Sequence, residues 1–232
     1  MSETKQKGRR LRFGEHLQLW SSEGRLFDGL RIRASVIGDH STDHVLDRVQ
    51  EALSVIRTYD PRRYARLRHQ LQMIWVQLQV DGSLGSYDER IGACGLDLRY
   101  VVSAEVAPSD LASTIVHEAT HARLNRFGYS EPTRGRIEAV CRKEERAFSE
   151  RLPQMERDKI RKKLERWQGV KDDWWSDAVF RERYTEGIPE TLRYMGVPGW
   201  FVPVIILARR VVVSIRRFAR VIARFASGLT RA

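Results

Sequence analysis

The stretch PSDLASTIVHEATHARLNRFG, residues 108–128, decides the fold. It opens with Pro-Ser-Asp at 108–110, a combination typical of a helix start. It ends at Gly128, and apolar side chains recur between these points at three- and four-residue spacing: Leu111, Ile115, Ala119 and Ala122. This period is that of an amphipathic helix with one buried face. The stretch therefore predicts a buried helix at the centre of the chain.

The residues before this helix predict strands and helices in alternation. Leu30 to Val36 alternates apolar with polar residues, as a half-buried strand does, and the run His16 to Trp20 is a candidate partner for it. The other predicted elements are a helix from Ser41 or Thr42 to Ile56, a short helix from Pro61, a strand over Leu71 to Val80 and one or two strands within Tyr87 to Val102.

The residues after it predict helices only. Residues 132–183 are charged, helical in period and nearly free of glycine. The sequence thus predicts an α+β fold. Its small mixed or antiparallel sheet would pack on the helix that carries His117-Glu118-x-x-His121 and on a following helix that carries a glutamate, and its C-terminal half would be helical.

The charge lies at the two ends of the chain. The 232 residues carry a net charge of +11. Residues 1–12 hold five basic residues against one acidic residue, and residues 191–232 hold eight arginines and no acidic residue. We therefore divide the chain into a basic arm (1–12), a nearly neutral catalytic domain (13–190) and a basic amphipathic tail (191–232).

The composition excludes several classes of protein. A hydrophobic content of 42% excludes disorder throughout, and two cysteines exclude a disulfide-rich scaffold. No apolar run follows the first basic residues, so we expect no secretory signal and a cytoplasmic location.

The tail has the composition of a helix that lies on a membrane. In residues 200–226, apolar residues step by three or four on one face and arginines lie opposite. This pattern predicts peripheral attachment to an anionic membrane surface. Docking of the tail on the domain is the alternative. Nucleic acid is a less favoured partner because no base-reading motif is present.

The chemistry is concentrated in His117-Glu118-Ala119-Thr120-His121. Two histidines four residues apart lie on one helix face, so both imidazoles can bind one ion while the glutamate between them reaches a bound water. These are the parts of a zinc hydrolase site. The alternative is two ordinary helix histidines.

A third ligand has to come from a carboxylate, because no histidine follows His121. Glu138, seventeen residues further on and near the start of the next helix, is the preferred candidate. Glu145 is the competitor, since it lies seven residues later on the same helical face. Cys141 lies one helical turn from Glu138, although a lone helical cysteine is usually a small core residue.

These residues resemble the gluzincin metallopeptidases, in particular their compact members, over roughly residues 70–152. The resemblance implies that His117, His121 and Glu138 bind zinc and that Glu118 is the general base. It also implies that a strand within Ile91 to Val102 is a sheet edge that pairs with an extended peptide.

The sequence departs from the family at two positions. Arg123 replaces an apolar residue, and the downstream histidine that would stabilise the oxyanion is absent. The candidates for this donor are Tyr129, Arg134, Arg136, Tyr184 and Tyr194.

The preferred hypothesis is a zinc-dependent hydrolase that acts on peptides or proteins. The alternative is a non-catalytic binding or regulatory module that the C-terminal helix tethers to a membrane surface or a partner. Other features carry weaker signals: His40 and His44 are expected to be solvated, the charge run 142–166 is expected to be a solvated face, and Trp174-Trp175 is either a buried anchor or part of a cleft.

Overall fold

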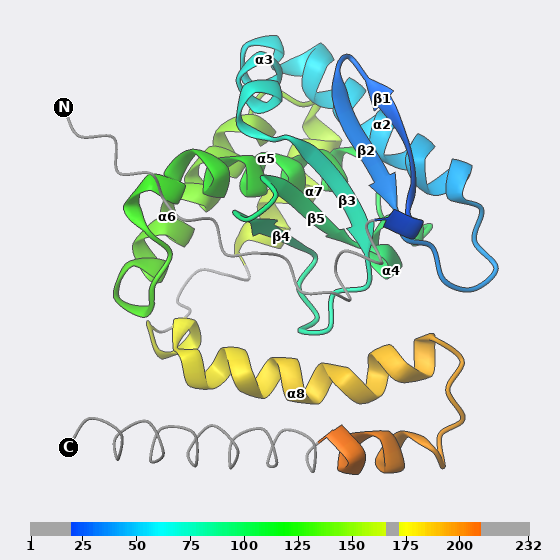
Figure 1. The fold of residues 1–232 in the computed structure, drawn as a ribbon. Helices are drawn as coiled ribbons and strands as arrows, with labels where there is room; N and C mark the ends of the chain where they lie inside the picture. The colour runs from blue at the N-terminus through cyan, green and yellow to red at the C-terminus, as the bar shows by residue number, and fades with distance from the viewer. Residues whose placement is uncertain (1–19, 166–171, 210–232) are drawn as a thin grey trace, which may run out of the picture.

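The computed structural model describes residues 20–165 and 172–209, which form the predicted α+β fold (Figure 1). A mixed five-stranded sheet comes first in the chain, and helices make up the C-terminal half. The basic arm 1–12 and most of the tail lie outside the described residues.

The sheet has the strand order β1-β2-β3-β5-β4. β2 pairs in parallel with β3, and β3 in parallel with β5, whereas the outer pairs β1-β2 and β5-β4 are antiparallel. The strand bounds are β1 Glu23–Phe27, β2 Leu30–Ala34, β3 Met73–Gln77, β4 Gly85–Asp88 and β5 Ala93–Asp97.

β2 pairs with β1, which follows the run His16 to Trp20 in the chain. Only Trp20 of that run is described, so the pairing expected for the run concerns residues outside the described ranges. Asp28 and Gly29 join β1 to β2 and both have positive φ, 48° and 83°. Asp-Gly with two positive φ angles is the favoured two-residue hairpin turn. This short signal places the hairpin at residues 23–34.

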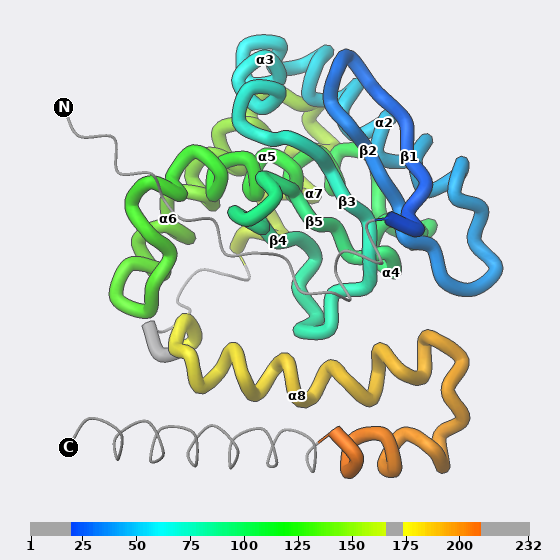
Figure 2. The backbone as a smooth tube through the Cα atoms, viewed as in Figure 1, coloured from blue at the N-terminus to red at the C-terminus, as the bar shows by residue number. Residues whose placement is uncertain are grey.

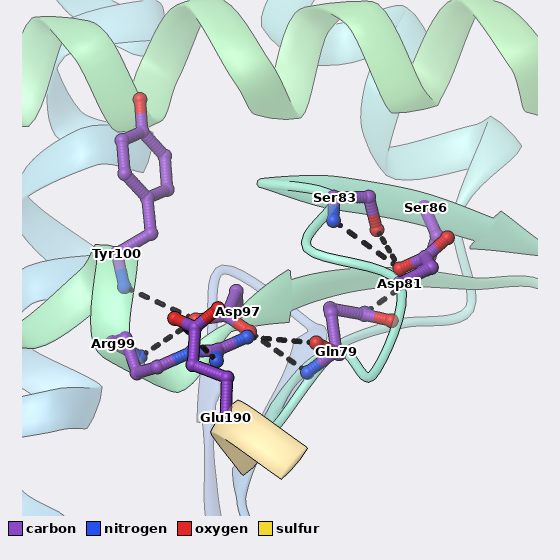
Figure 3. Close-up of polar contacts among 8 residues, drawn as sticks. All are labelled: Gln79, Asp81, Ser83, Ser86, Asp97, Arg99, Tyr100 and Glu190. Atoms are coloured by element: carbon purple, nitrogen blue, oxygen red, sulfur yellow. Dashed lines mark hydrogen bonds and ion pairs between the residues drawn. The ribbon is translucent and has the colours of Figure 1, made fainter. Parts of the chain in front are cut away.

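The long helices begin and end close to where their periodicity predicts. The helices in chain order are α2 Thr42–Tyr59, α3 Pro61–Gln70, α4 Leu98–Val102, α5 Pro108–Leu124, α6 Glu131–Ser149, α7 Gln154–Glu165 and α8 Asp177–Tyr194, with short 3₁₀ turns at Asn125–Phe127 and Asp172–Trp175. The strand expected within Tyr87 to Val102 is β5, and the last five residues of that range form the short helix α4. The Asp97 carboxylate accepts from the backbone N–H groups of Arg99 and Tyr100 and so caps α4 (Figure 3).

The predicted central helix, α5, is buried on most of its circumference. Its apolar side chains pack with those of α2 and with Ile74, Val76, Cys94 and Leu96 of the sheet in one core. The opposite side of β3 carries Met73 and Trp75, which form a second small cluster with Ala93. The sheet therefore uses its two faces differently: one packs in the main core, and the other carries this small separate cluster.

Helix α8 lies along the outside of this body (Figures 1 and 2). Among its described side chains, only Thr191 is buried. Gly187 meets the loop after β3, because a Cβ at this position would lie 1.7 Å from the Val80 carbonyl oxygen. Glu190 extends to Arg99, at 3.4 Å, and Arg99 is held in turn by Asp97 (Figure 3). A glycine contact and polar contacts thus join α8 to the sheet.

Residues 202–209 are helical and turn back along α8, with the Arg209 guanidinium 5.2 Å from the Tyr184 ring centroid. Val202 is buried, whereas Trp200, Phe201, Val204 and Leu207 are exposed. In the described part of the chain, no helix is both long and apolar enough to cross a membrane. The rest of the predicted amphipathic segment, residues 210–226, lies outside the described ranges.

Candidate metal centre

Helix α5 brings His117 and His121 to one side of a single turn. Their Nε2 atoms lie 3.2 Å apart and their ring centroids 5.0 Å apart. Two imidazole nitrogens at this separation face the same point, as the spacing of four predicts.

Helix α6 adds Glu138 to this pair. One carboxylate oxygen of Glu138 lies 3.3 Å from His117 Nε2, and the other lies 3.3 Å from His121 Nε2. The Tyr129 hydroxyl, from the turn between the two helices, donates to the Glu138 carboxylate at 2.8 Å. The short turn that Gly128 allows, with φ of 71°, thus places all these groups together.

The donor atoms have the spacing of a zinc site. Tetrahedral zinc with bonds of about 2.0–2.1 Å separates its donor atoms by about 3.3 Å. Here the two Nε2 atoms lie 3.2 Å apart, and each lies 3.3 Å from a different oxygen of Glu138. Two imidazoles and a carboxylate are also the donor set of one common type of catalytic zinc site, so the residues fit the ion in both chemistry and size.

Cys141 is a fourth possible donor. Its buried sulfur lies within 4.8 Å of ligand nitrogens of both histidines. Burial raises the pKa of the Cys141 thiol, with the charge of Glu138 as the next cause, so the thiolate is disfavoured. The Glu138 carboxylate, which lies 3.3 Å from each Nε2 atom and is ionised, is the alternative third donor.

Glu145, the competitor for the third position, lies behind His117. Its carboxylate accepts from Nδ1 of His117 at 3.2 Å, from the Ser113 hydroxyl at 2.7 Å, and lies 3.6 Å from Lys163 Nζ. A carboxylate on the far nitrogen of a ligand histidine fixes the tautomer and orientation of the ring. Glu138 and Glu145 therefore have different positions, one at the Nε2 atoms and one at Nδ1.

The electrostatics of the cluster favour a cation between these groups. Burial opposes a charge on His117, but hydrogen bonds to Glu138 and Glu145 outweigh burial and raise its pKa to about 10. Burial raises the pKa of Glu138, but the two histidines outweigh it and hold this pKa far below the usual range. The carboxylates thus stabilise a positive charge at the position where an ion would lie.

Glu118 lies beside the cluster, against the edge strand β4. It is 5% exposed, and burial raises the pKa of its carboxyl, although His117 and His121 oppose this rise. A Cβ at Gly85 would lie 2.9 Å from Glu118 Oε1 and 2.8 Å from a methyl carbon of Thr114. Glycine at position 85 therefore leaves the room that the Glu118 carboxylate occupies.

A cleft of about 1050 Å³, the central cleft, contains these residues. Helices α5 and α6 line it with His117, His121, Glu118 and Glu138. The other walls come from β4 and the following turn, from Trp75 on the sheet, from Lys163 on α7, from Trp175, and from Phe180 and Arg183 on α8.

The strand at the cleft is not the expected one. The resemblance implies a sheet edge within Ile91 to Val102, but β5 lies between β3 and β4, and both of its sides are paired. The edge strand that lines the cleft is β4, Gly85–Asp88. The expectation was wrong because β4 folds back outside β5, which the residue period does not reveal.

Only Tyr129 of the candidate oxyanion donors lines the cleft. Arg134 donates to the Trp175 carbonyl and pairs with Asp177, and Arg136 is exposed. Tyr184 contacts Arg209, and the Tyr194 hydroxyl is buried outside the cleft lining. His40 and His44 are exposed, as predicted.

Four cationic residues of the described chain line the cleft, and sequence reasoning identified none of them: Arg142, Lys163, Arg90 and Arg183. The first two belong to the charge run that was interpreted as a solvated face. Arg142 lies four residues after Glu138 and therefore on the same helix face, and this spacing could have placed it next to the metal centre. Trp175 is buried and lines the cleft, so it combines the two roles considered for Trp174-Trp175.

No protein-family model matches the chain, and neither a curated protein nor a solved structure is detectably similar to it.

Proposed function

We propose that the protein is a zinc-dependent hydrolase of peptide bonds, of the gluzincin type, with zinc held by His117, His121 and Glu138. The observation that carries this proposal is the convergence of the two Nε2 atoms, 3.2 Å apart, with the Glu138 carboxylate, which places one oxygen 3.3 Å from each of them. The position of Glu145 at Nδ1 of His117 adds the outer carboxylate that such sites use.

Glu118 is the general base of this proposal. A zinc ion at the site would lower the pKa of a bound water to roughly 7 and polarise the substrate carbonyl. The Glu118 carboxylate lines the same cleft as the three donors and accepts the proton of the attacking water. Its raised pKa brings proton acceptance, and later donation to the leaving amine, closer to neutral pH.

Tyr129 and Arg142 are the proposed donors to the oxyanion. The Tyr129 hydroxyl lies 2.8 Å and the Arg142 guanidinium 3.9 Å from oxygens of Glu138, and both side chains line the cleft. N–H and O–H donors next to the reacting carbonyl stabilise the negative charge that develops there.

Metal analysis tests the proposal directly. We expect one zinc per purified full-length chain and hydrolysis of some members of a diverse peptide mixture, followed by mass spectrometry. A chelator should abolish the hydrolysis and added zinc should restore it. Protein that carries no zinc when purified and binds none on titration would overturn the proposal.

The pH dependence of zinc binding is a sharper form of this test. In the metal-free protein His117 keeps its proton up to a pKa of about 10, so zinc must displace this proton. The apparent affinity should therefore rise about tenfold per pH unit between about pH 6 and about pH 9. Titration with a zinc-buffered indicator measures it, and a flat profile would contradict the proton competition.

Attachment to an anionic membrane surface is a second proposed function, in a peripheral location. The observation that favours it is the exposure of large apolar side chains at residues 200–207, with Trp200 77% and Leu207 63% exposed. Eight arginines and no acidic residue in 191–232 supply the complementary charge. The same surface would attach the protein to the membrane if it is a non-catalytic binding module instead of a hydrolase.

Vesicle co-sedimentation tests this attachment. The full chain should bind vesicles that contain one quarter phosphatidylglycerol. It should bind vesicles of pure phosphatidylcholine much more weakly. Changing Trp200 and Leu207 together to serine should weaken binding about tenfold or more, since each buries an apolar side chain in the membrane. Met155→Ser, at an exposed apolar residue of α7, is the matched control. Equal binding to both vesicles, or no effect of the double change, would exclude this role.

A further inference from the structure

The cationic side chains of the central cleft differ in whether they have a partner. Among the described residues they are Arg90, Arg142, Lys163 and Arg183. Arg90 pairs with Asp88 at 2.5 Å, Lys163 lies 3.6 Å from Glu145, and Arg142 lies 3.9 Å from Glu138. Within the same described ranges, no carboxylate lies within ion-pair distance of Arg183. Among the described cationic residues of the cleft, Arg183 is therefore the one whose charge no nearby carboxylate neutralises.

Aromatic rings hold the Arg183 guanidinium in position. The guanidinium carbon lies 4.4 Å from the ring centroid of Phe180, one turn earlier on α8, and 5.1 Å from that of Trp174. Cation–π contacts of this kind orient an arginine without neutralising it. Nε and Nη2 are covered and have no hydrogen-bond partner in the described structure, which leaves Nη1 as the nitrogen that meets a ligand.

This arrangement is costly without an anion. A covered guanidinium that lacks hydrogen-bond partners loses its hydration and gains only the ring contacts in exchange. A charge-assisted hydrogen bond from the accessible Nη1 to a carboxylate is stronger than one to a neutral group. The missing partner is therefore best supplied by a carboxylate that enters the cleft.

We propose that Arg183 binds a carboxylate of the substrate, so that the cleft selects acidic peptides. This inference rests on the proposed function, because it assigns the ligand to the same cleft. The carboxylate comes either from an aspartate or glutamate side chain or from the C-terminus of the peptide. A peptide in this cleft contacts α5 and α6 on one wall and Arg183 of α8 on another.

A binding measurement tests this selection without turnover. The full-length, zinc-loaded chain with Glu118→Gln is titrated with three peptides, followed by tryptophan fluorescence or calorimetry. They are acetyl-Ala-Ala-Glu-Ala-Ala-amide, its glutamine counterpart, and acetyl-pentaalanine with a free C-terminus. We expect at least one carboxylate peptide to bind about tenfold more tightly than the neutral peptide. The peptide that gains identifies the source of the carboxylate.

Arg183→Gln should remove this preference. Arg181→Gln is the matched control, because it removes the same charge two residues away on the exposed part of α8. Arg183→Lys should retain part of the preference, since it keeps the charge but places it on a differently shaped, more strongly hydrated group. A preference that survives Arg183→Gln would place the carboxylate on the metal and overturn the proposal, as would equal binding of all three peptides.

The outcomes separate this inference from the proposed function. The metal dependence of the preference is measured on the chelator-treated chain. If the chain binds no zinc but Arg183 still selects carboxylates, the inference holds and the zinc hydrolase does not. If zinc and hydrolysis are found without the preference, only the inference fails.

Discussion

The Glu118→Gln protein is expected to retain one zinc per chain and to hydrolyse its substrate about 10²–10⁴-fold more slowly than the wild type. Glutamine has nearly the same shape as glutamate, so it fits the space beside Gly85. It cannot accept a proton from water, and this is the function proposed for the Glu118 carboxylate. Zinc should stay because Glu118 is not among the three closest donors.

The assay compares initial rates on a peptide that the wild type cleaves, together with zinc content. Glu105→Gln, on an exposed turn, is the control for the loss of one negative charge. An unchanged rate would show that the hydrolysis does not use Glu118. If the wild type binds zinc and cleaves none of a broad set of peptides, the non-catalytic module becomes the better hypothesis.

Glu138→Gln is expected to lower the affinity for zinc by more than about 100-fold, whereas Cys141→Ser should change it only a few-fold. Glu138 contacts both Nε2 atoms and supplies the negative charge of the site. The Cys141 sulfur also lies near both histidines, but its thiolate is disfavoured by burial. Glu145→Gln should lower the affinity for zinc by an intermediate factor of about 10–100, because Glu145 binds Nδ1 of His117 and so orients its ring.

Competition with a zinc chelator of known affinity measures all three variants, and circular dichroism checks that each is folded. The reverse order, with loss of zinc in Cys141→Ser and retention in Glu138→Gln, would make Cys141 the third ligand. Loss of zinc in all three variants together with loss of helicity would indicate a structural effect instead. In that case Glu138→Asp, which keeps the charge, separates the two explanations.

The parts that were predictable from the sequence are local in the chain. The helix of residues 108–124, the shared face of His117 and His121, and the proximity of Glu138 follow from helical period and one short turn. The hairpin at Asp28-Gly29 carried an equally local signal that was not used.

The parts that were not predictable depend on long-range pairing. Insertion of β5 between β3 and β4 moved the sheet edge to residues 85–88, and period-two patterns do not encode strand order. Arg142 and Lys163 belong to a charge run, and a charged residue of a metal site has the same local pattern as a solvated one. Arg183 reaches the cleft only because Gly187 lets α8 approach the loop after β3.

The order of the elements along the chain has a consequence for how the protein is made. The five strands of the described sheet, residues 23–97, precede the first proposed zinc donor, His117, and Glu145 comes later still. A chain that emerges from the ribosome at about 5–20 residues per second exposes the complete set of strands seconds before the zinc donors appear. If zinc binds as proposed, it therefore joins the chain only after all of these strands have been synthesised.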